Sequence, residues 1–144
     1  MTDGKQTTAF LSRVPLFRGL ERRQLERLGE KLYARTYVAG EAIVTQGTGG
    51  EGLFLLVSGG ADVVRERADG ERVVVNTVGP TDFFGELALL DGGLRTASVV
   101  ATEDTECLAL TRWDFLAILK EDVDMAVAIL QELAKRFRRA LDVL

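Results

Sequence analysis

The amino-acid sequence predicts a mainly β fold with flanking helices. Between residues 33 and 111, short runs rich in β-branched and aromatic side chains are separated by Gly, Asp and Asn about every ten residues. Helical periodicity precedes and follows this region. Regular short strands with turn signals indicate a sandwich, a jelly roll or a barrel. The 144 residues are enough for one domain, expected to span residues 1–144.

The lead-in, residues 1–32, is predicted to be helical. The segment LERRQLERLGEKL, residues 20–32, places Leu20, Leu25, Leu28 and Leu32 at helical spacing with charges between them. Ahead of it, apolar residues lie on both sides of Pro15. Because proline interrupts a helix, two short helical turns hinged at Pro15 are expected rather than one continuous helix.

Seven strands are predicted within residues 33–111. Their sequences are YARTYV, AIVT, GLFLLVS, ADVVRER, RVVVNTV, TASVVAT and ECLALT. The breaks between them fall at residues 39–40, 47–50, 59–60, 69–70 and 79–80, which are rich in glycine. Asp69-Gly70, between two valine-rich runs, is the clearest hairpin turn in the chain.

Two helices are predicted in residues 112–144. The first follows Thr111, with Asp114 three residues later as in a capped helix start, and Trp113 and Phe115 are expected in the core. The second runs from about Val123 to the end. Its apolar residues recur at alternating spacings of three and four, which indicates a coiled-coil seam of Val123, Ala126, Leu130, Leu133, Phe137, Ala140 and Leu144.

A basic cluster, residues 135–139, surrounds one aromatic side chain within this last helix. A solvated helix face is the expected interpretation. The alternative is that Arg138, or another residue of the helix, folds over a bound ligand as a lid.

Composition excludes several function classes. Eighteen basic and 22 acidic side chains give a net charge of −4, so any anion site must be local. The chain has no histidine, the commonest general base and metal ligand, and no P-loop, HExxH, GxSxG or CxxC motif. We therefore expect no enzyme, no metal and no cofactor. The single Cys107 is expected to be a buried, inert thiol, and its isolation together with the absence of a membrane span or signal peptide indicates a cytoplasmic protein.

The segment FGELALLDGGLRTASVVA, residues 84–101, carries the chemistry. A short helix is expected to begin at Gly85, where backbone N–H groups without helical partners attract an anion. The loop at residues 91–94 then returns Arg95 toward the same place. A guanidinium matches a phosphate with two parallel hydrogen bonds, whereas the carboxylate of Glu86 suits a ribose hydroxyl. Together these residues indicate a nucleotide with a buried phosphate.

FGELALL followed by RTASV, with nine positions between Glu86 and Arg95, resembles the phosphate-binding cassette of the cyclic nucleotide-binding domain family. That family includes the bacterial catabolite activators, the regulatory subunits of cyclic nucleotide-dependent kinases and the cyclic nucleotide-gated channels. Residues 14–17, 40–41, 46–47 and 53–59 also resemble family segments. The resemblance implies a jelly-roll β-roll, a double-stranded β-helix, with the cassette at residues 84–98.

The resemblance also implies roles for the cassette polar groups. Arg95 would pair with the cyclic phosphate, the Ala97 amide would complete the phosphate cradle, and Glu86 would bind the ribose 2′-hydroxyl. Thr96 leaves the choice between cAMP and cGMP open, since a hydroxyl there is associated with cGMP tolerance in eukaryotic members while bacterial cAMP receptors also carry Ser or Thr. We lean to cAMP.

Apolar contacts follow from the same resemblance. Gly85, Leu87 and Ala88 would surround the sugar. Val73 and Val75, on the fifth predicted strand, are with Leu87 the candidates for the apolar walls around the base.

The expected function is a cyclic nucleotide sensor that transmits its signal through the last helix. The expected partners are the nucleotide, a second copy joined through that helix, or an effector protein that the sequence does not name. No helix-turn-helix follows residue 144, so DNA binding is not expected, and the chain is either free-standing or a regulatory piece of a larger protein. The alternative is a ligand-free interaction or dimerisation domain of the same fold, and an enzyme is remote.

Overall fold

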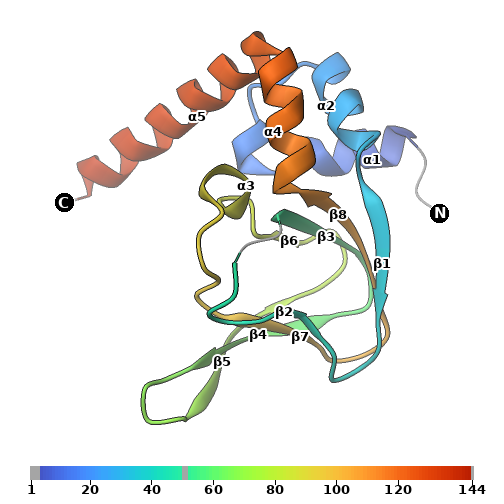
Figure 1. Ribbon diagram of the computed structural model, residues 1–144, viewed down its shortest axis with the longest axis vertical. Coiled ribbons are helices and arrows are strands. Elements are labelled where there is room, and N and C mark those ends of the chain that lie inside the picture. Colours follow the sequence, from blue (N-terminus) through green and yellow to red (C-terminus); the bar gives the residue numbers. More distant parts are fainter. Residues whose placement is uncertain (1–3, 50–51, 144) are drawn as a thin grey trace. The chain divides into compact units, whose positions relative to one another are not determined.

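The computed structural model describes residues 4–49 and 52–143 (Figure 1). Gly50, in one predicted break, and Leu144, the last predicted seam residue, lie outside this part of the chain. The chain divides into a helical unit, Met1–Lys31 with Trp113–Leu144, and a β unit, Leu32–Arg112. The mainly β fold with flanking helices is confirmed, and the single domain of residues 1–144 stays a prediction.

The β unit consists of two antiparallel four-stranded sheets with the orders β1-β8-β3-β6 and β2-β7-β4-β5. All seven predicted strands are confirmed, and a two-residue strand, β6, is added. The strands are β1 (Tyr33–Tyr37), β2 (Ala42–Val44), β3 (Gly52–Ser58), β4 (Ala61–Glu66), β5 (Arg72–Val78), β6 (Phe83–Phe84), β7 (Ser98–Ala101) and β8 (Thr105–Thr111).

The core of the β unit is formed by side chains from both sheets. Alternating strand residues point to opposite faces, so each sheet contributes one apolar face to the interior. The two phenylalanine rings of Phe54 on β3 and Phe84 on β6 stack with their centroids 5.1 Å apart. The buried cluster contains Tyr37, Ile43, Val44, Phe54, Leu56, Ala61, Val99, Ala101, Cys107 and Ala109.

The predicted hairpin at Asp69-Gly70 joins β4 and β5 (Figure 1). The Gly70 N–H donates to the Arg67 carbonyl, at 2.9 Å, and Gly70 has a φ of +86°. Glycine is favoured here because a side chain at such a positive φ is strained. β5 is an edge strand of its sheet.

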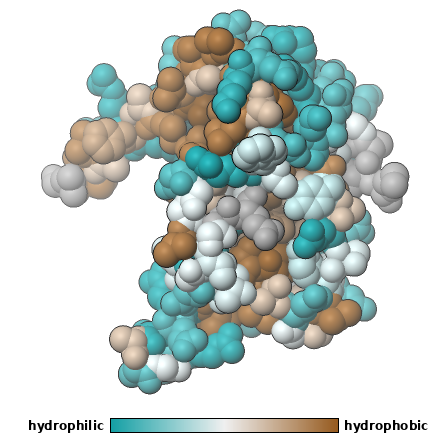
Figure 2. Space-filling model, in the orientation of Figure 1, coloured by the Kyte–Doolittle hydropathy of each residue, from teal (hydrophilic) through white to brown (hydrophobic). Residues whose placement is uncertain are grey.

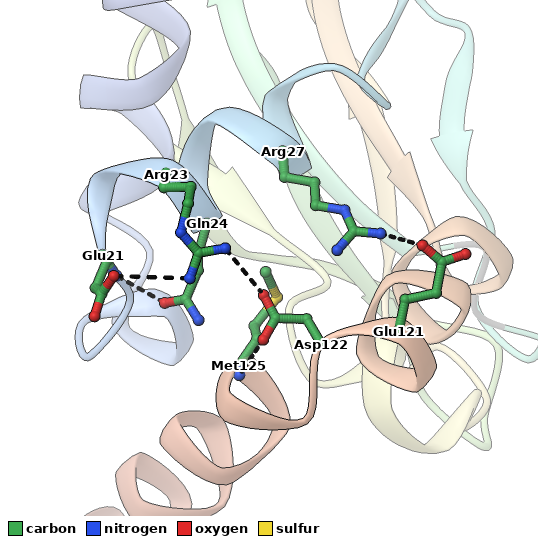
Figure 3. Close-up of polar contacts among 7 residues, drawn as sticks. All are labelled: Glu21, Arg23, Gln24, Arg27, Glu121, Asp122 and Met125. Carbon is green, nitrogen blue, oxygen red and sulfur yellow. Dashed lines mark hydrogen bonds and ion pairs between the residues drawn. The ribbon is translucent and has the colours of Figure 1, made fainter.

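The helical unit begins with α1 (Gly4–Ser12), a 3₁₀ turn η1 (Pro15–Phe17) and α2 (Arg22–Gly29). The predicted break at Pro15 is confirmed. The predicted helix over residues 20–32 is shorter in the structure and starts with a reciprocal capping box. The Glu21 side chain accepts from the N–H of Gln24, and the Gln24 side chain accepts from the N–H of Glu21, the second of these bonds being drawn in Figure 3.

The unit continues with α4 (Arg112–Glu121) and α5 (Val123–Asp142). Asp122 caps α5, since its Oδ1 accepts from the Met125 N–H at 3.0 Å, and its Oδ2 lies 3.9 Å from Arg23 of α2 (Figure 3). Arg27 of α2 also pairs with Glu121 (Figure 3). These contacts tie the start of α5 to α2.

The prediction for α4 is half right. Phe115 is fully buried and packs against Phe17, with ring centroids 6.0 Å apart. The prediction that Trp113 lies in the core is wrong, since this side chain is 84% exposed. Residues that are two positions apart in an α-helix differ by about 200° around its axis, so a helix that buries Phe115 turns Trp113 outward.

Only some of the residues of the seam predicted on α5 lie on the exposed face of this helix. Met125, Ile129 and Glu132 are the buried residues of the helix. We call the exposed large apolar residues of this helix the α5 row: Val123, Val127, Leu130, Phe137 and Leu141. Figure 2 shows brown, apolar surface along the helix. Ala126 and Leu133 of the predicted seam are half-buried instead.

The basic cluster at residues 135–139 is mostly exposed, Arg136 being half-buried, which confirms the solvated face. Among the described residues, no helix combines the length and the apolarity that crossing a membrane requires.

Candidate functional site

A pocket of about 490 Å³ opens in the β unit, a size typical of small-molecule sites. Most of its lining comes from the cassette, and the rest comes from β2, β4, β6 and β7. The lining residues are Val44, Val63, Phe83, Phe84, Gly85, Glu86, Leu87, Ala88, Asp91, Gly93, Leu94, Arg95, Thr96, Ala97 and Val99. Seven of the nine predicted ligand-binding residues are therefore brought together in one pocket.

Gly85 forms the turn at the end of β6, with a φ of +86°. A β-carbon at this position would lie 2.5 Å from Nη1 of Arg95 and even closer to the carbonyl oxygen of Gly52. Real β-carbons do not approach other atoms so closely. Glycine is therefore required both for the backbone conformation and for the close approach of the Arg95 guanidinium.

Arg95 is held at both its backbone and its side chain. Its N–H donates to the Thr48 carbonyl at 2.8 Å, and its carbonyl accepts from the Gly47 N–H at 2.9 Å. Its Nη2 donates to the Gly52 carbonyl at 2.7 Å. The guanidinium thus lies between the start of β3 and the turn at Gly85, and Arg95 forms part of the pocket lining.

The cassette helix, α3, spans Ala88–Asp91 and begins later than expected. The carbonyls of Gly85 and Glu86 already accept from the N–H groups of Ala88 and Leu89, at 3.1 and 3.2 Å. A hydrogen-bonded turn therefore separates Gly85 from the helix. Those two N–H groups donate within the chain, so fewer N–H groups at the helix start are available to an anion than the sequence predicted.

Val73 and Val75 are not among the pocket residues. Both lie on β5, and Val75 is 49% exposed. The sheet order β2-β7-β4-β5 places β5 at the edge, one strand farther from the cassette than β4. The valine and phenylalanine lining comes instead from β2, β4, β7 and β6, namely Val44, Val63, Val99, Phe83 and Phe84.

Arg112, which the sequence analysis did not single out, contacts the end of α3 together with two glycines of the following loop. Gly92 caps the helix with a φ of +62°, and its N–H donates to the Ala88 carbonyl at 3.1 Å. The Gly93 N–H donates to Oδ1 of Asp91, at 2.8 Å. Nη2 of Arg112 then donates to the Leu90 carbonyl, at 3.1 Å. No sequence pattern signals this last contact, because it joins residues far apart in the chain.

Cys107 is buried in β8 between the sheets. Burial, and secondarily the charge of Glu106, raises the pKa of its thiol to about 11. The predicted burial of Cys107 is confirmed, and a neutral thiol is a poor nucleophile, as expected for an inert cysteine. Within residues 4–49 and 52–143, no group of three or more Cys, Asp or Glu side chains could hold a metal ion.

The model of the cyclic nucleotide-binding domain family matches residues 34–122. The chain belongs to this family. The chain is accordingly a cyclic nucleotide-binding regulatory domain, and the ligand of the family is a cyclic nucleotide.

Similar proteins include a receptor and a regulatory subunit. The chain is 39% identical over 126 residues to the cyclic AMP receptor protein of Thermus thermophilus, covering 88% of this chain and 58% of that protein. It is 39% identical over 97 residues to the cAMP-dependent protein kinase regulatory subunit of Mycosarcoma maydis, covering 67% of this chain and 18% of the subunit. The chain thus spans little more than half of the receptor.

A solved structure matches nearly end to end. The N-terminal domain of a transcriptional regulator from Streptomyces coelicolor A3(2) is 31% identical, with a TM-score of 0.85, and the match covers 94% of this chain and 96% of that one.

Proposed function

We propose that this chain is a sensor module that binds cAMP in the cassette pocket, with cGMP as a second candidate ligand. Arg95 pairs with the cyclic phosphate, Glu86 accepts a hydrogen bond from the ribose 2′-hydroxyl, and the Ala97 amide completes the phosphate cradle. Thr96, beside them, discriminates between the two bases. The printed name of the Thermus thermophilus relative, a cyclic AMP receptor, supports cAMP as the first choice.

One observation carries this proposal: the guanidinium of Arg95 lies against Gly85 within a pocket that Glu86 and Thr96 also line. A positive group held at the wall of a concave, largely apolar pocket suits a compact ligand with one anionic group. The valine and phenylalanine side chains of the lining suit a flat heterocyclic base. A cyclic nucleotide combines these features.

The module is regulatory and performs no catalysis in this proposal. The relatives named above are a receptor and a regulatory subunit. Ligand binding shifts the population between two arrangements of α4 and α5, and the changed helices are read by a second copy or by an effector protein. The same proposal places the protein in the cytoplasm.

Calorimetric titration of the nucleotide-free protein with cAMP and with cGMP tests the proposal. We expect saturable binding of at least one of them. Replacement of Arg95 by leucine removes the charge partner of the phosphate, and truncating one partner of a buried charge pair costs about 2–5 kcal/mol. The Kd is then expected to rise by at least about 30-fold.

Arg67→Leu is the matched control, because Arg67 is an exposed arginine of the β4–β5 hairpin outside the pocket. It should bind like the wild type. Near-normal binding by Arg95→Leu would contradict the assignment of the site, and no binding by the wild type would contradict the proposed ligand.

The α5 row favours a second function, a ligand-free interaction or dimerisation domain. Phe137 is 66% exposed and Leu130 is 63% exposed, an unusual exposure for large apolar side chains along one helix. This alternative predicts self-association, measured by sedimentation, together with no heat in either titration. Saturable binding of a cyclic nucleotide would reject it.

A further inference from the structure

Arg112 occupies a special place in the chain, because it is both the last residue of the β unit and the first residue of α4. Its side chain reaches back to the cassette, where Nη2 donates to the carbonyl of Leu90 in α3, at 3.1 Å. One residue therefore belongs to α4 through its backbone and contacts the cassette through its side chain.

The Leu90 carbonyl lies in the last turn of α3, where carbonyl groups have no partner within the helix. Gly92 ends the helix in the left-handed conformation, and its N–H satisfies only the Ala88 carbonyl. A positively charged donor at this end supplies a hydrogen bond and complements the partial negative charge of the helix terminus. Arg112 thus completes the C-terminal cap of α3.

The Arg112 side chain also packs on this cap. A β-carbon at Gly92 would lie 3.3 Å from both Cδ and Nε of Arg112, which is tighter than ordinary contact. Glycine at position 92 avoids this close contact with the Arg112 side chain. The side chain is thus placed by packing as well as by its hydrogen bond.

Arg112 has little else to hold it. Its Nε is buried without a hydrogen-bond partner in the described part of the chain, and none of the ion pairs found there includes Arg112. If α3 moved away from Arg112, a half-buried guanidinium would lose its described partner, which is unfavourable. A displacement of α3 should therefore carry the Arg112 side chain with it.

We propose that Arg112 is the positioning residue that couples the cassette to the beginning of α4. This inference rests on the proposed function, because a cyclic nucleotide provides the displacement of α3. Ala88 and Asp91 of α3 line the pocket, whereas Arg112 does not. Arg112 therefore acts on α4 through α3 and not through contact with the ligand.

The chain contains its own reporter, since Trp113 is its only tryptophan, follows Arg112 directly and is exposed. The experiment compares wild type, Arg112→Met and Arg112→Lys by two measurements in parallel: calorimetric titration with cAMP, and the fractional change in Trp113 fluorescence between ligand-free and saturated protein. Methionine keeps an unbranched side chain beside Gly92 without the charge or the donor. Arg67→Met is the control for loss of an arginine elsewhere.

In the wild type, the fluorescence change and the heat should saturate at the same cAMP concentration. Arg112→Met should still bind cAMP, but its fluorescence change should fall to less than about a quarter of the wild-type value, because the link to α3 is lost. Arg112→Lys should recover part of the change, since an ammonium group also donates to a carbonyl. Arg67→Met should behave like the wild type.

Two outcomes would overturn the coupling: an unchanged fluorescence response in Arg112→Met, or a wild type that binds cAMP with no response from Trp113. If the unfolding curve of Arg112→Met shows that this variant does not fold, Arg112→Lys decides: a reduced but measurable response supports the proposal, and a response equal to that of the wild type, or its complete loss, opposes it. No heat from the wild type with either nucleotide is a different result, which refutes the proposed function itself.

Discussion

Replacement of Gly85 by alanine tests the geometry of the cassette directly. The added β-carbon would meet Nη1 of Arg95 at 2.5 Å and would lie closer still to the Gly52 carbonyl. It would also force a side chain into a φ of +86°. The first effect is a steric conflict inside the site, whereas the second is a cost of the backbone conformation alone.

Gly70→Ala separates the two effects. Gly70 has the same φ of +86°, but no atom lies within 4 Å of a β-carbon built there. A left-handed conformation costs a residue with a side chain roughly 1–2 kcal/mol, partly offset by the lower entropy of the unfolded alanine chain. Gly70→Ala should therefore lower the free energy of unfolding by only about 1 kcal/mol.

Gly85→Ala should cost more, because inserting a group into filled space adds typically 1–3 kcal/mol. We expect a total loss of about 2–4 kcal/mol, measured by urea unfolding. The Kd for cAMP should rise by more than about 10-fold in Gly85→Ala, because the Arg95 guanidinium is displaced, and should be unchanged in Gly70→Ala. Equal losses of stability in the two variants, with equal affinities, would refute the close approach of Arg95 to Gly85.

Three further results are expected. Phe137→Glu should weaken self-association through the α5 row in sedimentation experiments, and a variant that associates like the wild type would remove that row from the interface. Because burial raises the pKa of Cys107 to about 11, the folded chain holds the thiol proton more tightly than the unfolded chain. The contribution of this thiol to the free energy of unfolding should be fully present below about pH 8.5, and the free energy should fall by roughly 2–3 kcal/mol as the pH rises toward 11. Cys107→Ala should flatten this decline. Asp122→Ala should lower stability by about 1 kcal/mol through loss of the α5 cap, whereas Asp142→Ala, at the other end of α5, should not, and equal effects in thermal melts would contradict the role of the cap.

Local patterns in the sequence were sufficient to predict most of the fold. Seven strands could be located because most of them combine β-branched or aromatic residues with a glycine-rich break, and these signals act over a few neighbouring residues. β6 was missed because two residues, Phe83 and Phe84, are too short for any periodicity. Trp113 was misplaced because apolar character alone does not say which side of a helix faces the core.

The cassette could likewise be found from the sequence, since its residues lie within one continuous segment. Gly85, Glu86 and Arg95 are separated by a short helix and a turn, so their order alone indicates that they meet. The assignment of Val73 and Val75 to the pocket had no such basis. It depended on which strands neighbour the cassette, and the sheet order places β4 and β7 there instead of β5.

By itself, the amino-acid sequence determined the mainly β fold with its flanking helices and the segment that forms the candidate site, because propensity, turn chemistry and spacing are properties of near neighbours along the chain; the choice of a β-roll came from the family resemblance. Only the tertiary structure decided what holds that segment. The Gly52 carbonyl that receives Arg95 is 43 residues away in sequence, and the Leu90 carbonyl that receives Arg112 is 22 residues away. Contacts of this kind depend on how strands are paired in space, which no local pattern encodes.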